Sequence, residues 1–270
     1  MNTTLFYGML IYFALGAVVP EQDKQERQKK LFVKDSFEEL DFVKNWKGAE
    51  KCCSYSMMRS DSIARKGKYS LRLELNLADG VVAGSKRVEL RTANEKNANV
   101  ERWYKFSTYF PQDYALDVIP EIIAQWHENP DFDLGEKWRS PPIALEIIKG
   151  KWQVRVLSAS EKVNTNKTLS SNNSFDIEEF KAGTWNDWIF HIHFSFEEDG
   201  LIQVWHNGKL VVDHAGPNYY NDKKGPYFKI GLYKWGWKAK NVRSAVARRV
   251  LYIDDVKIGG ENMTYDLMKK

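Results

Sequence analysis

The sequence predicts an all-β protein, a jelly-roll-like sandwich of two antiparallel sheets with a concave groove. Many short segments alternate apolar and polar residues with period two, and Gly, Pro, Asn and Asp separate them. No long helical period and no strand–helix–strand rhythm competes with this pattern. Strands with one apolar face bury it against a second layer, so two sheets packed face to face are expected.

The alternation is clearest at residues 70–77, where Leu71, Leu73 and Leu75 point to one side of a strand. The same reasoning predicts ten further strands, at residues 86–91, 102–110, 121–127, 143–148, 151–157, 188–196, 201–206, 209–213, 226–234 and 249–258. Asn207-Gly208 predicts a type I′ hairpin turn within residues 204–212. Lys149-Gly150 predicts a second hairpin.

The chain divides into four parts. Residues 1–19 are uncharged and mostly apolar with small residues near their end, which predicts a signal peptide and hence a secreted or periplasmic protein. A retained membrane anchor is the alternative, although the apolar run is short for a bilayer span. Residues 20–35 are expected to be a polar linker, residues 36–260 the folded domain and residues 261–270 a C-terminal tail. No membrane contact is expected after signal cleavage.

Net charge and cysteine content limit the kinds of partner, disulfide and metal site that the sequence predicts. The 270 residues carry a formal net charge of +4, which favours an anionic partner. Basic residues do not cluster in runs, so no nucleic-acid partner is expected. Cys52 and Cys53 are adjacent and cannot link distant parts of the chain, so we expect no structural disulfide and no zinc site. A monomer is expected.

Residues 128–142 are expected to be a loop at the sheet ends, and residues 164–174 a polar, low-complexity loop. Asp131, Asp133 and Glu136 in the first of them could hold calcium in a structural role, but their spacing is not that of an EF-hand.

Three of the strands carry an unusual polar face. In KRVELR (86–91), Val88 and Leu90 share one face and Arg87, Glu89 and Arg91 the other. In IIAQWH (122–127), Ile122, Ala124 and Trp126 oppose Gln125 and His127, and in YFKIGLY (227–233), Phe228, Ile230 and Leu232 oppose Tyr227, Lys229, Gly231 and Tyr233. A solvated sheet face usually carries Lys, Glu and Thr. Here Arg, Gln, His and Tyr dominate, and Gly231 leaves a gap that suits a ligand.

These three motifs, in this order, resemble those of jelly-roll polysaccharide lyases, which carry R-x-E-L, Q-x-H and Y-F-K-x-G-x-Y. The resemblance covers about residues 36–260 and looks closest to the heparin lyase I-like group, with motifs shared by alginate and glucuronan lyases. It implies a polysaccharide lyase that binds an acidic polysaccharide in the groove and cleaves it by β-elimination, with no cofactor required.

The chemistry of β-elimination gives each polar residue a role. Arg87, Gln125 and Lys229 are the expected substrate-binding residues, because cations and an amide donor must hold the uronate carboxylate as its C5 proton leaves. His127 is the natural base and Tyr233 the natural acid. The C5 configuration of the sugar decides which of the two takes the proton, and that stays open. Glu89 is expected to orient Arg87 or Arg91.

The sequence is also compatible with two other functions, and four further residues have to be interpreted. A non-catalytic carbohydrate-binding protein would keep the groove and its aromatic residues, and a sandwich-fold glycoside hydrolase would need two carboxylates flanking the bond. Trp235 and Trp237 could stack on sugar rings or close the sandwich. His191 and His193 alternate along one strand and are interpreted as strand-surface residues.

Overall fold

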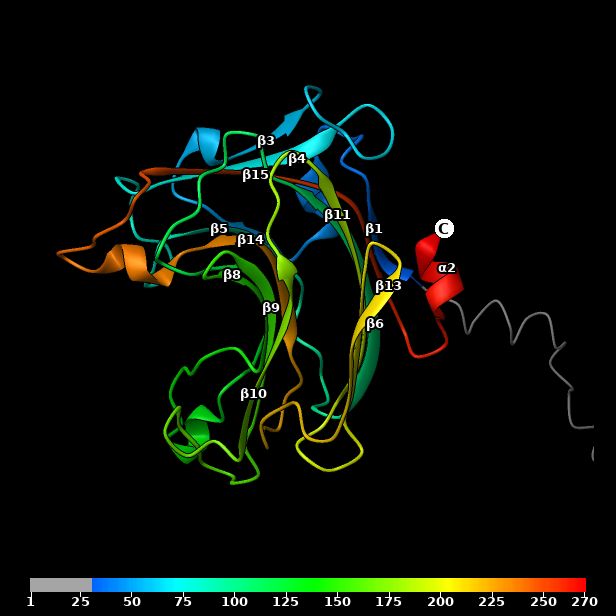
Figure 1. The fold of residues 1–270 in the computed structure, drawn as a ribbon. Helices are drawn as coiled ribbons and strands as arrows, with labels where there is room; N and C mark the ends of the chain where they lie inside the picture. Colours follow the sequence, from blue (N-terminus) through cyan, green and yellow to red (C-terminus); the bar gives the residue numbers. More distant parts are fainter. Residues whose placement is uncertain (1–30) are drawn as a thin grey trace, which may run out of the picture.

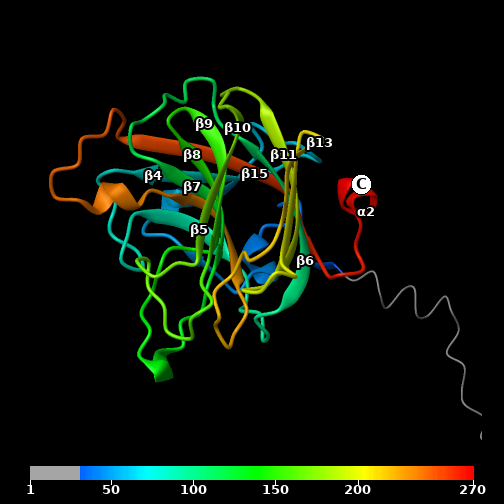
Figure 2. The same cartoon turned by 60° about the horizontal axis from the view of Figure 1, so that its bottom comes forward.

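A computed structural model describes residues 31–270 of the 270-residue chain. The expected signal peptide and most of the expected linker lie outside the described residues. Within residues 31–270, no helix is long and apolar enough to cross a membrane. The fold is a sandwich of two antiparallel sheets, as the sequence predicts (Figures 1 and 2).

The first sheet has eight strands. Seven follow the order β13-β12-β11-β6-β15-β4-β3, and β1 pairs with β15. Their bounds are β1 Leu31–Asp35, β3 Met57–Ser60, β4 Ser70–Asn76, β6 Val100–Tyr109, β11 Trp185–Phe194, β12 Leu201–His206, β13 Lys209–Ala215 and β15 Arg248–Gly259.

The second sheet has seven strands in the order β10-β9-β8-β7-β14-β5-β2, and it curves strongly (Figure 1). Their bounds are β2 Gly48–Glu50, β5 Arg87–Arg91, β7 Glu121–His127, β8 Ile143–Ile148, β9 Lys151–Ser158, β10 Ser171–Glu179 and β14 Tyr227–Tyr233. Four 3-10 helices lie between strands: η1 Phe42–Asn45, η2 Ser54–Ser56, η3 Phe132–Leu134 and η4 Trp235–Lys238. The short helix α2, Tyr265–Lys269, lies outside the first sheet, away from the curved sheet (Figure 1).

The core lies between the sheets and confirms the predicted strand faces. The apolar residues of the three motif strands are all buried there: Val88, Leu90, Ala124, Trp126, Phe228, Ile230 and Leu232. Leucines of β4 and phenylalanines of β6 and β11 face them from the first sheet. Since each strand buries one face here, its other face is free to form a polar surface.

Both predicted hairpins are confirmed. Asn207 and Gly208 have φ of 50° and 85° between β12 and β13, and Lys149 and Gly150 have φ of 51° and 77° between β8 and β9. Positive φ at both central residues is the mark of a type I′ turn, whose twist matches that of the strands.

The structure adds strands that the alternation pattern does not reveal. Residues 31–35, placed in the linker from sequence, form β1, and residues 171–174, expected to be loop, begin β10. The strands β2 and β3 span three and four residues, too few to show a period. In the expected C-terminal tail, Met268 of α2 is buried against Trp103 of the first sheet.

One predicted side-chain direction is wrong. The alternation pattern predicts Ile122 on the core face of its strand. In the structure Ile122 lines the polar groove, and Ile123 packs in the core instead. The pairing of β7 with β8 and with β14 shifts register here, between Ile122 and Ala124 and between Ile230 and Tyr233. A β-bulge inserts one residue and reverses the alternation beyond it.

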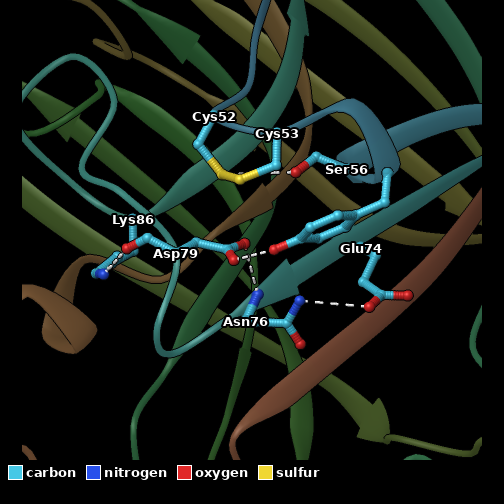
Figure 3. The surroundings of a disulfide bond; sticks show 8 residues. Cys52, Cys53, Ser56, Glu74, Asn76, Asp79 and Lys86 are labelled. Atoms are coloured by element: carbon cyan, nitrogen blue, oxygen red, sulfur yellow. Dashed lines mark hydrogen bonds between the residues drawn. A yellow bond between two sulfur atoms is a disulfide. The ribbon is translucent and has the colours of Figure 1, made fainter.

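The expectation of no disulfide is also wrong, because Cys52 and Cys53 are bonded to each other. This vicinal disulfide follows β2 after one residue, Lys51, and lies beside Ser56 of η2 and Asp79 (Figure 3). Asp79 accepts hydrogen bonds from the Tyr55 hydroxyl and the Asn76 backbone N–H. The bond closes a local ring between neighbouring residues and, as the sequence implies, links no distant parts of the chain.

Candidate active site

The register of three adjacent strands brings the motif residues together. Across β7 and β14, Tyr227 pairs with His127 and Lys229 with Gln125. On the other side of β14, Tyr233 pairs with Arg87. The five predicted site residues therefore share one face of the curved sheet, although Arg87 and Tyr233 are far apart in the sequence.

A groove of 1090 Å³ runs over this face. His127, Tyr233, Arg87 and Lys229 all line it, while Gln125 is fully buried beneath. The other charged side chains of the lining are Arg91, Arg139, Arg155, Lys238, Glu50 and Glu146, so cations outnumber carboxylates. An excess of positive charge in an open groove attracts an anionic chain.

His127 is held by its neighbour in the sequence. Its Nδ1 lies 2.6 Å from a carboxylate oxygen of Glu128, which is completely buried. The ring stacks on Tyr227, with centroids 5.5 Å apart, and meets Trp138 edge-on. With Nδ1 engaged by the carboxylate, Nε2 is the nitrogen left to exchange a proton with a ligand.

Glu128 is itself fixed by a buried cluster around Arg139. The Arg139 backbone N–H donates to Glu128 at 3.0 Å, and its guanidinium donates to Glu136 at 2.7 Å and to both oxygens of Asp222 at 2.8 and 2.9 Å. The guanidinium thus bonds two carboxylates, and a third, that of Glu128, lies 3.7 Å from its Nε. Burial, reinforced by the neighbouring carboxylates, raises the pKa of Asp222 to about 7 despite its bonds to Arg139.

The two tyrosines of the Y-F-K-x-G-x-Y motif differ in environment. Tyr227 is buried, and burial together with nearby carboxylates raises the pKa of its phenol. Tyr233 is more exposed at the other end of β14, and the Arg87 guanidinium lies 4.3 Å from its ring centre. No hydrogen bond within residues 31–270 engages the Tyr233 hydroxyl. Both tyrosines line the groove, and Tyr233 is the more exposed of the two.

The three residues expected to bind substrate contact carboxylates of the protein itself. The Lys229 Nζ lies 2.7 Å from Glu50 and 3.3 Å from Glu89, and Arg87 lies 3.2 and 3.3 Å from the same two side chains. The Gln125 amide donates to Glu89. Glu89 thus orients Arg87, as expected, but it also engages the other two residues from below.

Gly231 does not leave the open gap expected from sequence. Its φ is +152°, and a Cβ at this position would lie 2.1 Å from the Val88 carbonyl oxygen. The backbone of β5 already occupies that space. Glycine is needed here because two strand backbones approach closely.

Of the other candidate residues named from the sequence, one lines the groove and three do not. Trp235 lines it and packs near Tyr233, whereas Trp237 is buried in the core. His191 and His193 lie on β11 in the other sheet, within hydrogen-bond distance of Glu101 and Asn99 respectively.

The candidate calcium ligands are engaged by protein groups. Asp131 accepts from the Lys223 backbone, Asp133 pairs with Lys223, and Glu136 pairs with Arg139. Within the described part of the chain, the one group spaced like metal ligands is Cys52, Cys53 and Asp79, whose sulfurs form the disulfide.

Sequence reasoning missed two residues of the site. Glu128 directly follows the Gln-x-His motif, so its position beside His127 was a usable signal. Glu50 lies in a three-residue edge strand with no pattern of its own. Its place beside Lys229 depends on the pairing of β2 with β5, for which the sequence holds no signal.

The fold and the groove together define a β-sandwich protein with an open groove lined mostly by cations. The chain belongs to the polysaccharide lyase family: the family model described as "Polysaccharide lyase" matches residues 37–257. It is therefore an enzyme, a lyase acting on polysaccharides. No curated protein matches the sequence.

Solved structures agree with this fold. The endo-β-1,4-glucuronan lyase of the fungus Trichoderma reesei superposes with a TM-score of 0.66 at 18% identity, covering 80% of this chain and 91% of that one. The alginate lyase PA1167 of Pseudomonas aeruginosa gives 0.50 at 15% identity, covering 77% and 87%. Alginate lyase A1-II′, of polysaccharide lyase family 7, gives 0.51 at 17% identity, covering 78% and 86%. At these identities the likeness concerns the fold.

Proposed function

We propose that this enzyme cleaves a uronate-containing acidic polysaccharide by β-elimination, using His127 and Tyr233 as its acid and base. The observation that carries the proposal is the single groove in which a histidine, an accessible tyrosine and several cations meet. Those residues come from β5, β7 and β14, so only the folded sheet assembles them.

The reaction needs three things from the groove. A base removes the proton at C5, a double bond forms between C4 and C5, and the C4–O bond breaks as an acid protonates the leaving oxygen. Proton transfers of this kind typically contribute about 10²- to 10⁴-fold each. The C5 proton becomes acidic enough only when donors and cations stabilise the charge that gathers on the carboxylate.

His127 and Tyr233 suit the two proton transfers. His127 lines the groove, and its Nδ1 lies beside the Glu128 carboxylate, which leaves Nε2 for exchange of a proton with the substrate. Tyr233 lines the same groove, with the Arg87 guanidinium over its ring. In syn elimination one group can serve both steps, and in anti elimination the two act from opposite sides of the sugar.

A structural neighbour points to the same residue types. The structure of a family 7 alginate lyase has been determined with substrate in a variant that carries one His-to-Asn and one Tyr-to-Phe change, at a TM-score of 0.51 and 16% identity. This supports testing His127 and Tyr233 first.

The glycoside hydrolase alternative is disfavoured by the carboxylates of the groove. Glu146 pairs with Arg155 at 2.7 Å. Burial alone would raise the pKa of Glu50, but the Lys229 ammonium and Arg87 hold it below its ordinary value. A hydrolase needs one carboxylic acid kept protonated, and the surroundings of Glu50 favour the anion while Glu146 is taken up in an ion pair.

We extend the proposal to the substrate, the location of the protein and its cofactor requirement. The polymer could be a glucuronan, an alginate or, as the sequence resemblance suggests, a heparin-type chain. We expect the mature protein to be secreted or periplasmic and to need no cofactor, because side chains supply the charge that holds the carboxylate.

The test is a panel of purified polymers, assayed by the ultraviolet absorbance of the unsaturated product. The panel includes glucuronan, alginates of both C5 configurations, heparin, heparan sulfate and a neutral glucan. We expect activity on at least one uronate polymer and none on the neutral glucan. Binding without product would favour a carbohydrate-binding protein, and activity confined to the neutral glucan would refute the lyase mechanism.

A further inference from the structure

We propose that Glu50 is a resident carboxylate in the subsite for the uronate carboxyl group, and that polymer binding displaces it. The inference rests on the proposed function, because it assigns the substrate carboxylate to Arg87 and Lys229. It adds a residue outside the three motifs, one that sets how tightly substrate binds.

The register of β2 creates an unfavourable pair that needs cations. Glu50 lies directly opposite Glu89 in the antiparallel pairing of β2 with β5. Like charges facing each other across two strands destabilise a sheet. Here Lys229 and Arg87 contact both carboxylates at 2.7 to 3.3 Å, so two cations balance two anions.

The two carboxylates are not equivalent. The Glu89 side chain is 1% exposed and accepts from Gln125 below the groove, whereas the Glu50 side chain is 17% exposed and lines the groove. Glu89 therefore stays paired with Lys229 and Arg87 at the floor of the groove. Glu50 holds the outward side of Lys229 and Arg87, the side from which a polymer would approach.

Charge balance then requires an exchange. A uronate carboxylate added beside Glu50 and Glu89 would place three anions on two cations in a partly buried site, and each buried charge without a partner is costly. If Glu50 leaves as the substrate carboxylate arrives, the two-to-two balance is restored. Glu50 stays ionised at neutral pH, since Lys229 and Arg87 hold its pKa below the ordinary value against the effect of burial.

Two features of the structure favour such an exchange. β2 has only three residues and lies at the sheet edge, where local opening costs least. In addition, Arg87 Nε and Gln125 Oε1 are buried without a hydrogen-bond partner among residues 31–270. Buried polar atoms are normally paired, so the cluster is incomplete without a further group such as an ordered water or a ligand.

The experiment compares three variants on the best polymer from the panel. In Glu50→Gln the charge is lost, and in Glu50→Asp the charge remains on a side chain that is one methylene shorter, which should weaken its contacts with the two cations. We expect KM to fall by about fivefold or more in both variants, without a fall in kcat. Fivefold is about the lower end of the change in affinity that one bound group causes for another. Glu146→Gln removes a carboxylate from the same groove and controls for net charge; it should change KM far less.

Three results would overturn the inference. One is an equal fall of KM in the Glu50 and Glu146 variants, which would indicate general electrostatics. Another is an unchanged KM in Glu50→Asp. The third is a fall in kcat at unchanged or raised KM, which would make Glu50 a residue that positions Lys229.

Calorimetric titration with a saturated uronate oligosaccharide separates this inference from the proposed function. It needs no turnover, so it still tests displacement of Glu50 if the wild-type enzyme proves inactive on every uronate polymer. Tighter binding to both Glu50 variants than to wild type is expected, and equal binding would refute displacement. A melting curve for each preparation verifies that the variants are folded.

Discussion

At the scale of single residues, environment separates side chains that the sequence makes look alike. Tyr227 and Tyr233 begin and end the same strand and both line the groove, but Tyr227 is buried and Tyr233 is more exposed. Lys229 has the residue type expected of an anion binder, yet it is 2% exposed and already paired. Residue type was predictable from the motifs, whereas the partner of each side chain depends on neighbours brought in from other strands.

The substitution Tyr233→Phe keeps the ring and removes the hydroxyl. We expect kcat to fall by at least about 10²-fold, because a sugar alkoxide leaves slowly without a proton. Polymer binding and melting temperature should change little. Tyr227→Phe is the matched control, since it deletes the buried phenol of the same strand and should retain most of the activity. A Tyr233→Phe enzyme that melts like the parent and keeps more than about a third of its rate would remove Tyr233 from the mechanism.

Glu128 is expected to act through His127. The substitution Glu128→Gln keeps the shape of the side chain but removes the charge that holds the His127 ring in place, so kcat should fall roughly tenfold or more with little change in KM. Glu136→Gln also removes a carboxylate from Arg139 but does not touch His127. Steady-state kinetics of both variants decide the matter. Equal losses in the two would show that Glu128 matters only as a part of the Arg139 cluster.

At the scale of strands, register decides what the site contains. The period-two pattern predicted eleven strands and the core face of β5 and β14, because a half-buried strand must alternate. It failed at Ile122, where a bulge reverses the alternation, and at β10, whose SNNS start is too polar to suggest a strand. It also failed at β2, which carries Glu50 to the site through only three residues.

The close approach of β5 and β14 can be tested at Gly231. A methyl group there would meet the Val88 carbonyl oxygen at 2.1 Å, and the residue holds a positive φ. We expect Gly231→Ala to lower the free energy of unfolding by at least about 2 kcal/mol, from backbone strain and overpacking together. Gly48→Ala on β2 meets no atom within 4 Å and is the control. Chemical denaturation of both measures the difference, and equal stabilities would mean that the strands can move apart freely.

At the scale of the whole molecule, the Arg139 cluster ties three loops to the floor of the groove. Arg139 and Glu136 come from the loop after β7, Asn164 from the loop before β10, and Asp222 from the loop before β14. The loop carrying η3 and the segment carrying η4 project from the curved sheet (Figures 1 and 2). The sequence predicts loops at residues 128–142 and 164–174 but holds no signal that one arginine would join them to each other and to the loop that carries Asp222.

This cluster predicts a pH dependence of stability. Asp222 has a pKa of about 7 in the folded protein against an ordinary value of 3.8, so between these values the folded state holds a proton that the unfolded state has lost. The contribution of Asp222 therefore falls as the pH rises through this window. In Asp222→Asn, the decrease in unfolding free energy from about pH 5 to about pH 8 should be smaller than in wild type. Parallel pH profiles from chemical denaturation would contradict the assignment.

The central claim is that this groove breaks its polymer by elimination. Digestion of the preferred uronate polymer in heavy-oxygen water, followed by mass spectrometry and ultraviolet absorbance of the products, tests it most directly. Elimination predicts unsaturated ends that absorb, with no heavy oxygen incorporated at the cleavage site. Products that carry heavy oxygen and lack the absorbance would show hydrolysis and contradict the account.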